Sequence, residues 1–200
     1  MFFDRPHTAT VEEMLDKFAV KELVEYERFC RDNALWEQMT QCFTDTSQVT
    51  ISWYQGSGRG FVEASSKMET RAPHKLNSTL VWLNGDRAAA VTMACIQTRS
   101  RIEGQTLDLA SYTRLLYTLV REKGIWKIAT MDCIYEKDCL TPAAPADFRP
   151  VRPAARDSYS NLAGVLSLEG YSIADDLPGD DRPELTKVLL ERTGRWLDRS

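Results

Sequence analysis

After a polar lead-in over residues 1–9, hydrophobic residues recur at the three- and four-residue spacing of a helix through the first forty positions. Thr10 and Glu13 form a capping box, which predicts a helix start at residue 11. An interruption at 31–33 separates this helix from a second one over 34–43. The apolar positions are Met14, Phe18, Val20, Leu23, Val24 and Phe29 in the first helix, and Ala34, Leu35, Trp36, Met39, Cys42 and Phe43 in the second.

The period then changes from helix to strand. Residues 48–54 are β-branched and aromatic, which favours a strand, and the glycine-rich stretch 56–60 reads as a loop before a short helix over 61–70. Long strands are expected over 75–83, 88–102, 107–121 and 126–135, joined by tight turns, of which Asn84-Gly85 is a strong hairpin signal. The predicted class is α+β: a curved antiparallel sheet with the N-terminal helices on its concave face, leaving a cone-shaped apolar pocket.

The last sixty residues differ in composition, because six of the eight prolines lie after residue 140. Two short helices are still expected there, over 160–168 and 182–197, the second with Pro183 in its first turn. We therefore expect a domain over 10–140 and a proline-rich arm over 141–200. The arm is expected to dock on that domain or on a neighbouring subunit.

Three local motifs accompany this order of elements. They are D-x-x-x-W at 32–36, H-x-x-N at 74–77 followed by a G-D turn at 85–86, and G-x-W-x-I at 124–128. Together they resemble the nuclear-transport-factor-2-like superfamily, and within it the SnoaL-like and scytalone dehydratase-like branch. The resemblance covers about residues 11–140 and implies the cone-shaped fold. It implies nothing about the arm.

Charge and composition exclude several classes of function. The net charge is −4 and no run of Lys or Arg forms a basic stripe, so nucleic acid is not an expected partner. No apolar stretch approaches the roughly 20 residues of a membrane span, and the N-terminus lacks the features of a signal peptide, so a cytoplasmic location is expected. Five irregularly spaced cysteines and two histidines predict reduced thiols, no metal site and no cofactor.

The resemblance implies that Asp32 and His74 meet inside the cone as an acid–base dyad. Imidazole exchanges protons near neutral pH, and a carboxylate bonded to Nδ1–H fixes its tautomer. Two structural alternatives remain open: Asp32 as the cap of the helix that begins at Ala34, and His74 as a structural histidine. His7 is expected at the surface.

Further pocket positions are expected at Trp53, Tyr54, Asn77, Thr113, Tyr112 and Arg59. Trp53 falls where scytalone dehydratase has a tyrosine, and Leu115 where it has an amide, which argues against that enzyme's own reaction. Asp108, Tyr112 and Arg114 share one face of a strand, which lines either the pocket or a subunit contact. The charged run at 135–138 is expected to be a solvated edge.

The preferred function is a cofactor-independent lyase that eliminates water, formaldehyde or another group from a hydroxylated aromatic or polycyclic molecule. Its partners would be that small molecule and further copies of the chain, in a dimer or trimer. One alternative is a non-catalytic binding protein, or an accessory subunit like the β subunit of ring-hydroxylating dioxygenases. Another is a polyketide cyclase or isomerase.

Overall fold

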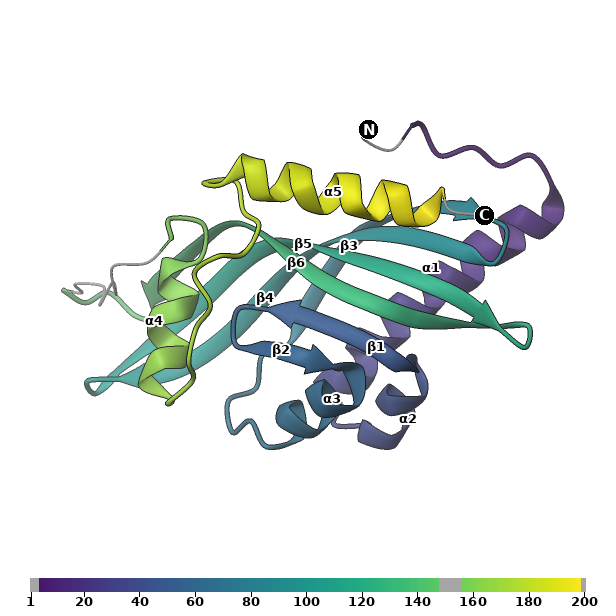
Figure 1. Ribbon diagram of the computed structural model, residues 1–200. Coiled ribbons are helices and arrows are strands. Elements are labelled where there is room, and N and C mark those ends of the chain that lie inside the picture. Colours follow the sequence, from purple (N-terminus) through teal and green to yellow (C-terminus); the bar gives the residue numbers. More distant parts are fainter. Residues whose placement is uncertain (1–3, 148–155, 199–200) are drawn as a thin grey trace.

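The computed structural model describes residues 4–147 and 156–198, so the lead-in expected over 1–9 and the arm expected over 141–200 are described only in part. The elements run from α1 to α5 along the chain (Figure 1). The helices are α1 (Val11–Asp32), α2 (Trp36–Gln41), α3 (Gly58–Ser66), α4 (Ser160–Leu168) and α5 (Pro183–Leu197). The strands are β1 (Phe43–Ile51), β2 (Tyr54–Ser57), β3 (His74–Asn84), β4 (Arg87–Ile102), β5 (Gln105–Glu122) and β6 (Ile125–Pro142).

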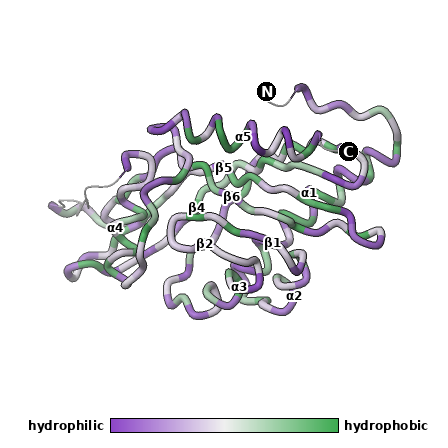
Figure 2. Tube along the Cα trace, in the orientation of Figure 1, coloured by the Kyte–Doolittle hydropathy of each residue, from purple (hydrophilic) through white to green (hydrophobic). Residues whose placement is uncertain are grey.

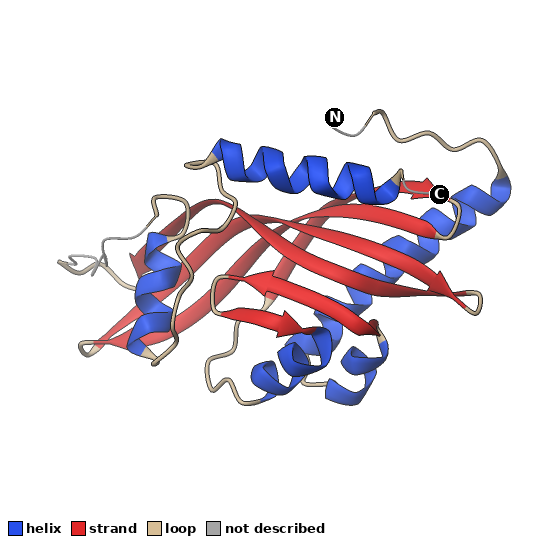
Figure 3. Cartoon of the chain, viewed as in Figure 1, coloured by secondary structure: helices blue, strands red, loops and turns tan. Residues whose placement is uncertain are grey.

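The six strands form one curved sheet in the order β2-β1-β6-β5-β4-β3 (Figure 3). The long strands β3 to β6 pair with their neighbours in antiparallel register, as the tight turns predict. The sheet is not antiparallel throughout, because β1 runs parallel to β6. The α+β class with a curved sheet is confirmed.

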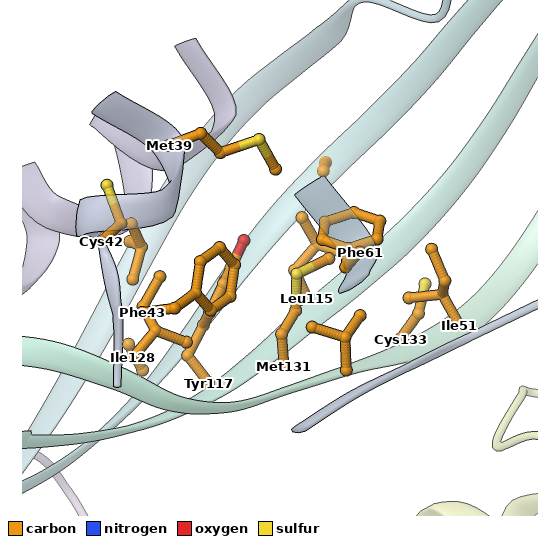
Figure 4. Close-up of a cluster of buried hydrophobic side chains, with 14 of the residues drawn as sticks. Met39, Cys42, Phe43, Ile51, Phe61, Leu115, Tyr117, Ile128, Met131 and Cys133 are labelled. Atoms are coloured by element: carbon orange, nitrogen blue, oxygen red, sulfur yellow. The ribbon is translucent and has the colours of Figure 1, made fainter. Parts of the chain in front are cut away.

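The main core lies between the inner face of the sheet and the N-terminal helices (Figure 4). Met39 of α2 and Phe61 of α3 lie over side chains of β5 and β6, among them Leu115 and Met131. The tryptophan of the G-x-W-x-I motif ties α1 to the sheet, because Trp126 Nε1 donates to Asp16 Oδ1 at 3.1 Å. These contacts hold α1 across the concave face.

α1 has the predicted helical period, but some of the residues expected on its buried face are exposed. Val20 and Val24 are fully buried, whereas Phe18 and Phe29 are 63% and 55% exposed. The side turned to the sheet continues instead through Glu27 and Arg28, which are both buried. Two charged side chains therefore occupy core positions that a hydrophobicity pattern assigns to apolar residues.

The strand expected over 48–54 begins earlier and ends earlier. β1 starts at Phe43, where it pairs with Ile128 of β6, and the chain turns at Ser52 and Trp53 into β2. The glycine-rich stretch 56–60 is not a loop. Ser57 caps α3 by accepting a hydrogen bond from the Gly60 amide at 3.1 Å, so the helix begins inside that stretch.

β6 continues seven residues beyond its expected end, so 135–138 is not a solvated edge. Tyr135 is buried, and Asp138 accepts hydrogen bonds from the backbone amide of Leu162 and from Asn161 Nδ2, both at 2.7 Å. The carboxylate thereby caps the first turn of α4. Asp138, which the sequence analysis expects to be solvated, therefore binds the arm to the domain.

The arm packs on both faces of the sheet. α4 lies on the side of the N-terminal helices, whereas α5 covers the outer face, where Leu189 packs against Leu116 and Ile134. Figure 2 shows hydrophobic and hydrophilic segments alternating along α5, as expected for a helix with one side on the sheet. Arg156 joins the two parts through two bonds to Asp181, at 2.8 and 2.7 Å. Among the described helices, none is long and apolar enough to cross a membrane.

Candidate functional site

A pocket lies between α1, the turn after β1, the inner face of the sheet and α4. Its walls are mainly apolar, with polar groups from α1, from the strands and from the segments between them. The apolar lining is Ile51, Trp53, Phe61, Met68, Ala72, Ile96, Leu115, Met131, Cys133, Leu162 and Leu166, and the polar lining is Arg28, Arg31, Ser52, Thr70, His74, Thr98 and Tyr135. Five of the apolar residues, including Phe61 and Leu115, are visible in Figure 4.

Asp32 and His74 meet at the head of this pocket. Asp32 is the last residue of α1 and His74 the first of β3. His74 Nδ1 lies 2.8 Å from Asp32 Oδ1, and the His74 backbone amide donates to Asp32 Oδ2 at 2.7 Å. Because both carboxylate oxygens bond to His74, and α2 has no side-chain cap, Asp32 does not act as the cap of the second helix.

This geometry defines the protonation state of the pair. Burial, together with the charges of Arg28 and Arg31, lowers the pKa of His74 to about 4, although the hydrogen bond to Asp32 acts to raise it. Burial acts to raise the pKa of Asp32, but the hydrogen bonds from His74 outweigh it and hold this pKa below its usual value. At neutral pH the imidazole is therefore uncharged, with Nδ1–H donated to the Asp32 carboxylate and Nε2 unprotonated.

Arg28 faces the other ring nitrogen of His74. Arg28 Nη1 lies 3.4 Å from His74 Nε2, which must be the acceptor because guanidinium only donates. Arg28 Nε also donates to Glu27 Oε2 at 2.6 Å, and Nη2 bonds to Glu27 Oε1. Burial acts to lower the pKa of Arg28, but the Glu27 carboxylate more than offsets this and raises it, so the cation is permanent. Both residues are almost fully buried.

Arg31 is the second cation in the pocket and is less well paired. Its Nη1 donates to the carbonyl of Ala72 at 3.3 Å, and its Nη2 lies 3.4 Å from the sulfur of Met68. The Asp32 carboxylate lies 3.8 Å from Nη1. Burial and the neighbouring charge of Arg28 lower the pKa of Arg31 to about 10, so this side chain is still a cation at neutral pH.

Of the six positions expected to bind substrate, Trp53 lines the pocket. Its ring packs against Phe61 and against Tyr171 of the arm, with centroids 5.7 and 5.6 Å apart. Thr113 is buried on the inner face of β5, outside the described lining. Thr98 lines the pocket, and its buried hydroxyl has no hydrogen-bond partner among the described residues.

The structure places the other four residues away from the pocket. Tyr54 donates to the carbonyl of Ser57 at 2.9 Å, and Arg59 is exposed at the start of α3. Asn77 is exposed at a register shift in β3, and Tyr112 points outward under Lys137. Tyr112 shares its outer face with Asp108, which pairs with Arg99, and with Arg114, which pairs with Glu136 and Asp180. That face therefore does not line the pocket.

The sequence reasoning missed the two arginines, Tyr135 and the two leucines of α4. The arginines gave a usable signal, since Arg28, Arg31 and Asp32 recur at helical spacing on the same helix that carries the candidate acid. Leu162 and Leu166 gave none, because they lie about ninety residues from His74. The cysteines add no nucleophile here: burial raises the pKa of Cys133, the one thiol in the described lining, to about 12.

The described residues contain no cluster of three or more His, Cys, Asp or Glu side chains that could hold a metal ion. The polar groups of the pocket are instead suited to moving a proton. A neutral imidazole oriented by a carboxylate can act as a general base, and the adjacent cations can stabilise negative charge that develops on a substrate.

Comparison with known proteins places this arrangement in a family. A model of the SnoaL-like domain matches residues 12–132. Pea pathogenicity protein 2 of Fusarium vanettenii is 27% identical over 205 residues, which cover 92% of this chain and 86% of that protein.

Solved structures share the fold at lower sequence identity. A provisionally assigned scytalone dehydratase from Novosphingobium aromaticivorans is 15% identical, with a TM-score of 0.53 over 70% of this chain and 96% of that one. A type 2 hexachlorocyclohexane dehydrochlorinase (LinA) is 14% identical, with a TM-score of 0.56 over 72% of this chain and 99% of that one. Because the family model spans more than half of its length, the chain belongs to the SnoaL-like domain family and has the nuclear-transport-factor-2-like fold.

Proposed function

We propose that the chain is a cofactor-independent lyase in which His74 is the general base and Asp32 orients it. The observation that carries the proposal is the 2.8 Å contact between His74 Nδ1 and Asp32 Oδ1 at the head of an apolar pocket. The lowered pKa keeps His74 unprotonated at neutral pH, as a base must be, but it also makes the imidazole a weaker base than one that titrates near pH 7. The fold is shared with proteins named for a dehydratase and a dehydrochlorinase, both of which denote eliminations.

The proposed step is an elimination. His74 Nε2 takes a proton from a carbon of the substrate, and the electron pair left behind forms a carbon–carbon double bond as a hydroxyl group leaves from the adjacent carbon. The imidazolium returns the proton to the departing oxygen, which leaves as water. In the deformylation version, the base takes the proton of a primary alcohol, formaldehyde leaves and the carbanion is protonated. Asp32 stabilises the imidazolium in either case.

The mainly apolar walls of the pocket favour a flat aromatic substrate, and the cavity of about 40 Å³ must widen to admit one. Trp53 and Phe61 contribute aromatic rings to the lining, and residues such as Leu115 contribute aliphatic side chains. Aromatic faces stack with a flat ring at offset or edge-on angles, which adds about 0.5–1.5 kcal/mol per pair beyond the burial of area.

The test compares two dyad variants with a matched histidine variant. His74→Ala and Asp32→Asn are each expected to lower turnover at least ~100-fold, the usual contribution of a general base. His7→Ala removes the other imidazole, which is exposed, and should leave turnover unchanged. The measurement is loss of water or formaldehyde from a panel of hydroxylated aromatic alcohols, followed by mass spectrometry.

The alternative of a binding protein or accessory subunit makes a different prediction. In that case no panel member is turned over, and the dyad variants bind an aromatic ligand as the wild type does. Turnover close to wild type in correctly folded His74→Ala and Asp32→Asn chains would remove the dyad mechanism altogether.

A further inference from the structure

Two cations line the polar end of the pocket. Arg28 and Arg31 both line it, one turn apart on α1, and none of the described lining residues is an aspartate or a glutamate. Their acidic neighbours, Glu27 and Asp32, belong to α1 but lie outside that lining. The cations thus face the space that a ligand would occupy, with the carboxylates behind them.

The two guanidinium groups have hydrogen-bonding capacity to spare. Each carries five N–H donors. Toward the pocket, Arg28 Nη1 has one described neighbour, His74 Nε2 at the long distance of 3.4 Å. Arg31 Nη2 contacts only the sulfur of Met68 among the described residues, and a thioether is a weak acceptor. An anionic oxygen would be a much stronger acceptor for both groups than these partners are.

We propose that Arg28 and Arg31 form an anion subsite of the pocket, which takes a substrate oxygen that is negatively charged or becomes so during the reaction. A carboxylate, a phenolate and an enolate share this chemistry. The inference rests on the proposed lyase function for its catalytic meaning, but the subsite itself is a binding property that can be measured without turnover.

The position of Arg28 links the subsite to the base. Because Arg28 Nη1 and His74 Nε2 are neighbours, a carbon acid whose proton faces Nε2 has its carbonyl oxygen within reach of Arg28. Proton transfer to Nε2 moves the C–H electron pair onto that oxygen and gives an enolate beside the guanidinium. When the enolate re-forms its carbonyl, the pair is released toward the adjacent carbon and expels hydroxide, which takes the proton from the imidazolium and leaves as water.

The apolar walls strengthen this electrostatic effect. Charge–charge attraction increases as the surrounding dielectric constant falls, and Phe61, Leu162 and Leu166 line the site with apolar side chains. The subsite therefore narrows the substrate class: an aromatic or polycyclic molecule with a carbonyl, carboxylate or phenolic oxygen next to the carbon that loses its proton.

Binding of two probes of equal shape tests the subsite. The probes are 2-naphthoate, which is an anion at pH 7.5, and the uncharged 2-naphthamide, with dissociation constants measured by calorimetry. The wild-type chain is expected to bind the carboxylate at least ~10-fold more tightly, the usual scale for hydrogen bonds to a charged group. Arg99→Gln, an exposed arginine on the outer face, should keep this preference.

The decisive variant changes both members of the buried pair. Arg28→Gln alone would leave the Glu27 carboxylate buried without its partner and endanger folding. The double variant Glu27→Gln/Arg28→Gln keeps the two sites neutral and is expected to fold but to lose the preference for 2-naphthoate. Arg31→Gln is expected to lose part of it.

The outcomes also separate this inference from the proposed function. His74→Ala abolishes the base but should keep the preference for 2-naphthoate. A wild-type chain without the preference, or a folded double variant that retains it, overturns the anion subsite whether or not turnover is found. Loss of the preference in the double variant supports the subsite even where no substrate of the panel reacts.

Discussion

Asp32 and His74 are 42 residues apart, and two short contacts join them. One contact is between side chains and fixes the imidazole tautomer. The other ties the carboxylate to the backbone where β3 begins, so the position of the ring depends on the end of α1. A single carboxylate thus orients the imidazole of His74 and binds the start of the strand that carries it. Asp32→Asn is therefore expected to disturb the tautomer more than the fold, since an amide oxygen can still accept from the backbone.

The charges around His74 predict its titration. Its imidazole signals, followed by NMR, should titrate near pH 4, and the His7→Ala variant assigns them because the chain has two histidines. Arg31→Gln removes one cation beside the ring and should shift the midpoint upward. A midpoint at or above 6.5 in the wild type would contradict the burial and charge argument.

The lowered pKa also affects stability. An unfolded His74 titrates near 6.5 and the folded one near 4, so the unfolded state binds more protons between these values. The free energy of unfolding therefore keeps the full contribution of neutral, buried His74 above pH 6.5. This contribution is lost progressively as the pH drops toward 4. This acid sensitivity should be reduced in a His74→Gln variant, measured by denaturant unfolding.

At the scale of elements, the site depends on where helices begin and end. α1 stops at Asp32, and β3 starts at His74 after the segment that carries Met68 and Ala72 past Arg31. α4 begins where the Asp138 carboxylate of β6 accepts a hydrogen bond from the backbone amide of Leu162, in the first turn of the helix. The contact between Asp32 and His74 and the Asp138 cap of α4 therefore position the two ends of the pocket.

Removing one cap tests this dependence. Asp138→Ala deletes the acceptor for Leu162 N and Asn161 Nδ2, which should destabilise α4 by about 1–2 kcal/mol. Hydrogen exchange is expected to increase in α4 and in the pocket wall beside Leu162, while the long strands stay protected. Asp45→Ala, an exposed acid on β1, is the matched control and should change neither. Unchanged protection of α4 in Asp138→Ala would show that apolar packing alone holds the helix.

At the scale of the whole molecule, the arm is part of the fold. It adds α4 to the pocket side and α5 to the outer face, and between them the chain bonds to β6, where the Tyr135 amide donates to the carbonyl of Pro178 at 3.0 Å. The buried guanidinium of Arg156 bonds to Asp181 and to the carbonyls of Asp175 and Leu177, at 2.7 and 2.9 Å for the carbonyls. One side chain thus ties the segment before α4 to the loop over residues 175–181.

Arg156→Ala is expected to release the arm. Loss of a buried ion pair and two charge-assisted hydrogen bonds should cost about 2–4 kcal/mol. Limited proteolysis should then cut the arm earlier than the sheet, and 2-naphthoate binding should weaken because Leu162 and Leu166 leave the pocket. Arg195→Ala on α5, whose contact with Glu191 is exposed, should cost less than 0.5 kcal/mol. Equal proteolysis of the two variants would argue against a structural role for Arg156. Whether the chain assembles into a dimer or trimer stays a prediction.

Local signals in the sequence determined the class and most of the element order. The helical period, the β-branched runs and the Asn-Gly and glycine turns depend on neighbours within a few residues, so they can be found without coordinates. The D-x-x-x-W and H-x-x-N motifs singled out Asp32 and His74, which the structure brings into contact. The start of α3 was misplaced because its glycines favour a loop, and the Ser57 cap overrides that preference.

The tertiary structure decided what no local pattern contains. Which face of α1 is buried depends on the sheet, and the sheet selects Glu27 and Arg28 over Phe18 and Phe29. Two adjacent residues of opposite charge normally indicate a solvated helix face. Glu27 and Arg28 instead form an ion pair inside the core. The pocket wall from α4 and the outward orientation of Tyr112 likewise arise from contacts between residues far apart in the chain. The sequence by itself therefore singled out Asp32 and His74 as the candidate pair. Long-range packing set the charge environment of His74 and closed the pocket around it.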